Sequence, residues 1–266
     1  MRISHPQAAY QGVAPENVFF VANDQQGQMG TGYVIPFMQG EMYPEQPLHL
    51  YMQIDAQPSA RSLLYGALLA RAEQLRTQTP NLPVRLYSLV APENLDMMHF
   101  YQNCGFKDDD GEDLFRFPLP QGYPRVPMGM QFASVPLQDE MSQTAFLNRL
   151  NQNRIQPFTR DNLTLWMQQQ HFMALGFYKG GLPVCECILT GTGQNVTLLM
   201  IYTKAEYRRQ GMATQLLESA FNLLRERGVT TVYTHVFRRH TPQVKLVQHF
   251  GGHFLRTVTA LPGIDL

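Results

Sequence analysis

The residues best suited to chemistry lie in a basic turn that contains a glycine. From residue 202 to 217 the sequence reads YTKAEYRRQGMATQLL. An apolar run, Val196 to Ile201, precedes the turn, and Thr214 to Arg227 follows it with apolar residues at helical spacing. A strand should therefore lead through the turn into a helix, whose free N–H groups and positive dipole end meet at Gly211 to Ala213. Small residues let a diphosphate approach the backbone, so the turn predicts a phosphate site.

The same turn resembles a known cofactor loop. Its residues 208–213, RRQGMA, resemble the pyrophosphate loop R/Q-x-x-G-x-G/A of the GNAT acyltransferase superfamily. An ordinary connection with two solvated arginines would give the same short pattern, but the flanking strand and helix favour the cofactor loop. The resemblance implies that acetyl-CoA binds here, with its pantetheine arm along the preceding strand. The implied cofactor contacts are Ile201, Tyr202, Thr203, Arg208, Arg209, Gln210, Gly211, Met212, Ala213 and Thr214.

Two similar series of elements follow one another along the chain. The first is predicted as strands Val18–Ala22, Thr31–Phe37 and Leu48–Ile54, helix Ala60–Arg76, strand Val84–Val90, helix Leu95–Asn103 and strand Leu114–Phe117. The second is predicted as helices Leu137–Arg154 and Arg160–Gln170, a hairpin from Phe172 to Leu189 around Gly180-Gly181, strand Val196–Thr203, helix Thr214–Arg227, strand Thr230–Phe237, helix Pro242–Phe250 and strand Phe254–Thr259. This order, found twice, resembles the GNAT fold. We therefore expect an α/β protein with mixed sheets, built as two tandem GNAT-like acyl-CoA N-acyltransferase domains.

A proline-rich stretch separates the two series. Five prolines and glycines fall between Pro118 and Pro127, a density that neither helix nor sheet interior tolerates. We expect a degenerate domain over residues 1–120, a linker over 121–134 and the acetyl-CoA domain over 135–266. The first series also lacks the two helices that open the second.

Each half retains one motif of the family and departs from the other. If Arg61 is aligned with Arg208, Leu64 occupies the position of Gly211, so the first half should bind acyl-CoA weakly or not at all. The sequence from Asn94 to Phe106 resembles the late motif N-x-x-A-x-x-L/F-Y-x-x-x-G-F, with Tyr101 as its tyrosine. In the family this tyrosine often protonates the leaving thiolate. Tyr101 is also typical of a packed core residue.

The second half lacks the usual acid and base. Val247 stands where the tyrosine is expected, and Leu199 where some members have a glutamate. Side chains able to move a proton remain on neighbouring segments, although each is also typical of a structural or surface position. The catalytic candidates are Glu186, Tyr233, His235 and His240.

Composition limits the cell compartment and the partners. Lys plus Arg equals Asp plus Glu at 21 each, so no overall field attracts nucleic acid or an anionic membrane. The cysteines, Cys104, Cys185 and Cys187, show no metal-ligand or disulfide spacing. The N-terminal ten residues have no apolar core of signal-peptide length. We expect a cytoplasmic protein without a bound metal.

The resemblance implies an acetyl-CoA-dependent N-acetyltransferase acting on a small-molecule or peptide amine, with the cofactor in the C-terminal domain. Because the usual acid and base are missing, a non-catalytic acyl-CoA-binding sensor or scaffold is the alternative. An aminoacyl-tRNA-dependent transferase of the same duplicated fold is disfavoured by the lack of a strongly basic surface. The sequence does not indicate which amine is acetylated, or the oligomeric state.

Overall fold

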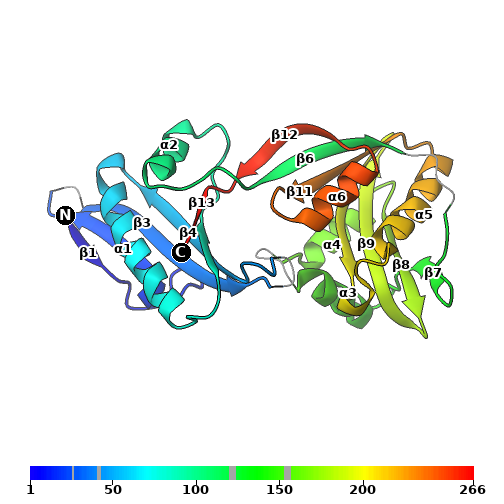
Figure 1. Cartoon of the computed structure of the whole chain (residues 1–266), viewed down its shortest axis with the longest axis horizontal. Coiled ribbons are helices and arrows are strands. Elements are labelled where there is room, and N and C mark those ends of the chain that lie inside the picture. Colours follow the sequence, from blue (N-terminus) through cyan, green and yellow to red (C-terminus); the bar gives the residue numbers. More distant parts are fainter. Residues whose placement is uncertain (26, 41–42, 120–123, 153–156) are drawn as a thin grey trace. The chain divides into compact units, whose positions relative to one another are not determined.

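The chain folds into two compact units, each with its own sheet. The computed structural model describes residues 1–266 apart from 26, 41–42, 120–123 and 153–156. The first unit comprises Met1–Glu112 and Val258–Leu266, and the second comprises Asp113–Thr257. Each sheet combines parallel and antiparallel neighbours and is accompanied by helices, which confirms the predicted α/β class with two sheet domains (Figure 1).

The first sheet has the strand order β1-β2-β3-β4-β5-β13. The elements of this unit are β1 (Arg2–Ser4), β2 (Val18–Asn23), β3 (Gly27–Met38), β4 (Leu48–Ala56), α1 (Pro58–Thr77), β5 (Val84–Tyr87), α2 (Leu95–Asn103) and β13 (Gly263–Asp265). Before β2 the described elements are β1 and one 3-10 turn, Pro15–Asn17. The two helices that open the second predicted series therefore have no counterpart here, as expected.

Helix α1 covers one face of the first sheet. Its buried residues recur at helical spacing and pack against alternate residues of β4, including Leu50 and Met52. Helix α1 begins at Pro58, earlier than predicted, because proline is well tolerated in the first turn of a helix. The resulting helix of 20 residues already includes Arg61 and Leu64.

The second sheet has the strand order β12-β6-β11-β10-β9-β8-β7. The elements of this unit are β6 (Gly111–Pro118), β7 (Gln131–Ser134), α3 (Glu140–Asn151), α4 (Arg160–Met167), β8 (Met173–Lys179), β9 (Leu182–Thr192), β10 (Asn195–Thr203), a 3-10 turn (Ala205–Tyr207), α5 (Met212–Glu226), β11 (Thr231–Phe237), α6 (Thr241–His249) and β12 (His253–Ala260). Residues 153–154, which end the predicted helix Leu137–Arg154, and residues 121–123 of the expected linker lie outside the described residues.

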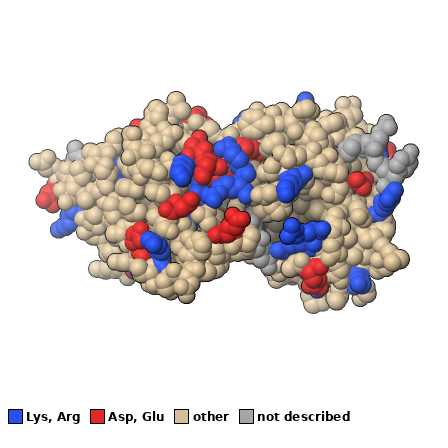
Figure 2. All heavy atoms as spheres, viewed as in Figure 1, with Lys and Arg blue, Asp and Glu red and all other residues tan. Residues whose placement is uncertain are grey.

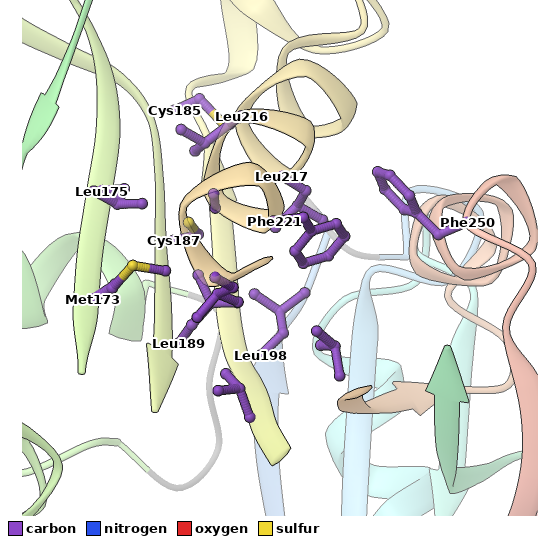
Figure 3. Close-up of a cluster of buried hydrophobic side chains, with 14 of the residues drawn as sticks. Met173, Leu175, Cys185, Cys187, Leu189, Leu198, Leu216, Leu217, Phe221 and Phe250 are labelled. Atoms are coloured by element: carbon purple, nitrogen blue, oxygen red, sulfur yellow. The ribbon is translucent and has the colours of Figure 1, made fainter. Parts of the chain in front are cut away.

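The second sheet carries helices on both faces. On one face, Leu216, Leu217 and Phe221 of α5 point toward the strand residues Cys187 and Leu198 (Figure 3). Both Cys185 and Cys187 lie in this core as free thiols. On the other face, α3 and α4 pack over a separate cluster that includes Ile188 of β9. The alternation of β9 residues between these two cores fixes the register of the strand.

Two strands, β6 and β13, each lie in the sheet of the other half of the chain. Strand β6 precedes the proline-rich stretch in sequence, yet it lies between β12 and β11 of the second sheet (Figure 1). Strand β13, at the C-terminus, pairs antiparallel with β5 of the first sheet. The two units therefore differ from the ranges expected from sequence: residues 113–118 lie in the second and residues 258–266 in the first.

Candidate functional site

The basic turn adopts the predicted path from strand to helix. Strand β10 ends at Thr203, a 3-10 turn follows, and α5 begins at Met212. Arg209 and Gly211 both have left-handed backbone conformations, with φ of 62° and 75°. Such a conformation is strained for a residue with a Cβ, so Gly211 is the residue type that position 211 requires.

Backbone donors collect at the start of α5. Gln215 is the first residue of this helix whose N–H bonds to a backbone carbonyl, that of Gly211 at 3.0 Å. The N-cap residue, Gly211, has no side chain that could accept a hydrogen bond from the N–H groups that precede that of Gln215. The earlier N–H groups therefore point out of the helix end, where the helix dipole is positive. This geometry suits an anion such as a diphosphate.

Side-chain bonds hold the loop in shape. Arg208 Nε donates to the carbonyl of Thr203 at 3.0 Å, and Gln210 Nε2 donates to that of Glu206 at 2.9 Å. Arg209 and Gly211 are exposed. The side chain of Met212 is buried in the core of the second unit.

The strand before the loop separates from its parallel neighbour. Pairing of β10 with β11 runs from Asn195↔Thr231 to Leu198↔Thr234 and then stops. Beyond that point β10 pairs only with β9, and an irregularity between Leu198 and Met200 shifts its register. Residues 201–203 therefore lie beyond the end of the β10–β11 ladder, where an extended chain with amide groups could add to β10. Their role as cofactor contacts stays a prediction.

The structure places Glu186 in an ion pair. Its side chain is fully buried and accepts hydrogen bonds from Arg149 Nε at 2.7 Å, Arg149 Nη2 at 2.9 Å and the Tyr178 hydroxyl at 3.1 Å. Both oxygens of this carboxylate are therefore already occupied by donors of the protein. Arg149 was missed by sequence reasoning, because it lies 37 residues away on a different element.

Tyr233 and His235 share one face of β11, as the alternation predicts. Val232 and Val236 face the core under α5, whereas Tyr233 is half-buried and His235 exposed on the opposite face. The sheet therefore places these two candidates on the side that α3 and α4 cover.

His240 is brought close to the loop. It is the N-cap residue of α6, and burial lowers the pKa of its imidazole below the ordinary value. The charge of Arg208 lowers this pKa further, while a hydrogen bond with Gln243 opposes the shift. An imidazole that stays neutral at physiological pH can accept a proton. His240 thus feels the charge of an arginine of the loop.

The motif tyrosine survives only in the first unit. Val247 lies in the core of the second unit and offers no hydroxyl. Tyr101 is 1% exposed, and Ser88 Oγ donates to its hydroxyl at 2.9 Å. Burial raises the pKa of Tyr101 to about 12, so it remains protonated at neutral pH.

The first unit has no counterpart of the glycine turn. Leu64 is fully buried within α1. Arg61 bonds to the carbonyl of Ala56 and forms an ion pair with Asp96 at 2.6 Å. Neither the backbone nor the arginine at this position is arranged for a diphosphate.

Charge, possible metal ligands and hydropathy add three observations. Lys and Arg side chains lie beside Asp and Glu on the face seen in Figure 2, in keeping with a formal net charge of zero. Within the described ranges, no group of three or more His, Cys, Asp or Glu residues is placed to hold a metal ion. None of the described helices combines the length and apolar character needed to cross a membrane.

Comparison with known proteins identifies the fold. Residues 147–251 match the model of the acetyltransferase (GNAT) family. A GCN5-related N-acetyltransferase from Sphaerobacter thermophilus is similar in structure, with a TM-score of 0.51, 17% identity and coverage of 96% of this chain and 82% of that one. A conserved protein from Enterococcus faecalis, described as a probable N-acyltransferase, has a TM-score of 0.54 at 12% identity. The match covers 92% of this chain and 61% of that one.

A third solved structure agrees. A GCN5-related N-acetyltransferase from Anabaena variabilis gives a TM-score of 0.52 at 13% identity, covering 95% of this chain and 63% of that one. No curated protein matches the sequence. The chain thus contains a GNAT domain at residues 147–251 and has a GNAT acetyltransferase fold.

Proposed function

We propose, from the GNAT domain at residues 147–251, that the protein is an acetyl-CoA-dependent N-acetyltransferase whose cofactor binds the second unit. The observation that carries this proposal is the start of α5, where a left-handed Gly211 precedes N–H groups that no backbone carbonyl of the described residues accepts. The diphosphate binds these N–H groups, and the exposed Arg209 adds positive charge.

The pantetheine arm lies along residues 201–203, beyond the point where β10 stops pairing with β11. The thioester then sits at the gap between β10 and β11. A neutral amine attacks its carbonyl carbon and gives a tetrahedral oxyanion, which backbone N–H groups of the separated strand can stabilise. The C–S bond breaks, CoA leaves as the thiolate, and the proton of the amine passes to a base.

His240 is the proposed base. It is held near the loop at the N-cap of α6, and its lowered pKa keeps the imidazole neutral and able to accept a proton. We place Glu186 in a supporting role, because Arg149 and Tyr178 already occupy its oxygens. The acceptor is a small-molecule or peptide amine.

Release of free CoA tests the proposal. The chain is incubated with acetyl-CoA and a broad panel of amines, and free thiol is followed; a reaction without amine corrects for the cysteines of the chain. Release that depends on an amine supports the proposal.

A non-catalytic acyl-CoA-binding sensor or scaffold is the second candidate. It is favoured by Val247, which places a buried methyl-bearing side chain where the family has its acid. Binding of acetyl-CoA without thiol release on any amine would support this candidate and contradict the enzyme.

A further inference from the structure

The first unit contains a pocket that the acetyl-transfer proposal does not use. It lies where β4 and the chain after β5 separate: the parallel pairing of the two strands ends at Tyr51↔Tyr87, and residues 53–56 of β4 and 88–91 after β5 line the cavity. Its volume is about 440 Å³. That is within the range of pockets that hold organic molecules, about 300 to 1,000 Å³.

The one carboxylate in the lining has no partner. Asp55, near the end of β4, is exposed, and its side chain makes no hydrogen bond or ion pair within the part of the chain that the structure describes. The positive charge in the same lining, Arg61, is held by Asp96 outside it. The pocket therefore keeps one negative charge that the protein does not balance, and this charge favours a cationic ligand.

Aromatic rings lie around the same cavity. Tyr10 and Tyr33 line it and are half-buried. A ring face attracts an ammonium group, so these tyrosines reinforce the preference that Asp55 sets.

The floor of the pocket has an unused donor. Tyr101 and Ser88 both line it, and each is 1% exposed. Ser88 donates to Tyr101, so the hydroxyl proton of Tyr101 has no acceptor among the described residues. A buried donor without a partner is unfavourable, so this part of the pocket favours a ligand oxygen as acceptor.

A second donor and an apolar wall complete the lining. The Oε1 of Gln53 accepts a hydrogen bond from the Tyr51 hydroxyl at 2.5 Å. This bond fixes the orientation of the amide and leaves its NH₂ group available to donate to a ligand. Ile54, Leu89 and Met97 supply apolar surface.

We infer that the first unit binds a small primary amine that also carries a carbonyl or hydroxyl oxygen and an apolar group. The ammonium lies on Asp55 between the tyrosine rings, and the oxygen accepts from Tyr101. This inference goes beyond acetyl transfer: it needs neither the cofactor nor the second unit.

L-Phenylalaninamide, which has all three features, is the probe. Its N-acetyl derivative has the same shape without the charge and is the matched control. Binding of each to the whole chain is measured by calorimetry. We expect the amine to bind at least 10-fold more tightly than the derivative, since a hydrogen bond to a charged group contributes about 1.5 to 3 kcal/mol. Absence of binding, or equal affinity for both probes, would overturn the inference.

Variants locate the binding. Asp55→Asn should weaken the amine at least 10-fold, and Tyr101→Phe about 5-fold, whereas Asp24→Asn, an exposed carboxylate outside the pocket, should have no effect. Asp55 is exposed, so its variant tests binding without a burden on folding. Gly211→Glu in the second unit should also leave the affinity unchanged. Unchanged affinity in Asp55→Asn, or loss in Gly211→Glu, would contradict a site in the first unit.

Discussion

Arg149 binds both carboxylate oxygens of Glu186, at 2.7 and 2.9 Å, and thereby ties helix α3 to strand β9. Glu186 is fully buried, so removal of its partner leaves an uncompensated charge in the sheet. Breaking such a pair costs about 3 to 5 kcal/mol, whereas replacing both members by apolar residues costs much less.

Arg149→Met should therefore lower the free energy of unfolding by about 3 kcal/mol, and adding Glu186→Leu should recover much of that loss. Urea unfolding of the two single variants and the double variant measures both quantities. A loss below about 1 kcal/mol for Arg149→Met would show that the pair is not needed as an ion pair.

The pH dependence of acetyl transfer tests His240 as the base. Burial and the charge of Arg208 lower the pKa of His240 below 6.5, so it is neutral and able to accept a proton above that lowered value. The rate should rise with pH through a midpoint below 6.5 and lose this acid limb in His240→Gln. An unchanged limb in that variant would assign the base to another group.

The same shift has a consequence for stability. Between the lowered pKa and 6.5 the unfolded chain binds more protons at His240 than the folded chain does. The contribution of the neutral imidazole is therefore complete above pH 6.5 and is lost as the pH falls through the lowered pKa. The difference in unfolding free energy between wild type and His240→Gln, measured by urea from pH 7.5 to 5, should change in that direction. A difference independent of pH would contradict the assigned shift.

Strand β13 can be tested at Gly263. A Cβ at this position would come within 2.6 Å of Nη2 of Arg85, which is buried and bonded to Asp109 and Asp265. The guanidinium has little room to move, so Gly263→Ala should destabilise the protein by about 1 to 3 kcal/mol. Gly66→Ala is the control, since Gly66 is exposed in α1 and a Cβ there meets nothing within 4 Å. Equal unfolding midpoints for the two variants would contradict the placement of β13 beside Arg85.

Local sequence patterns were sufficient to predict the β8–β9 hairpin, the turn at Gly211 and helix α5. Gly180 and Gly181 have φ of 56° and 80° and join β8 to β9 as a two-residue hairpin, which the sequence predicts because such turns need residues that tolerate positive φ. Gly211 is predictable for the same reason, and α5 because its apolar residues recur on one face.

The exchange of strands and the partner of Glu186 were not predictable. The alternation at 114–117 identifies a strand, but the choice of sheet depends on edges formed far away in sequence. β13 has only three residues, too few for a periodic signal. Arg149 and Glu186 meet only after α3 packs on the sheet, and no short motif records that contact.

Calorimetry with acetyl-CoA tests most directly that the second unit holds the cofactor at the start of α5. Gly211→Glu adds a side chain and a negative charge where the diphosphate is proposed to bind, and Gly66→Glu makes the same change at an exposed position of α1. We predict that wild type and Gly66→Glu bind acetyl-CoA equally, and that Gly211→Glu binds about 100-fold more weakly or not at all. Equal affinity of Gly211→Glu and wild type, in variants that both remain folded, would contradict the account.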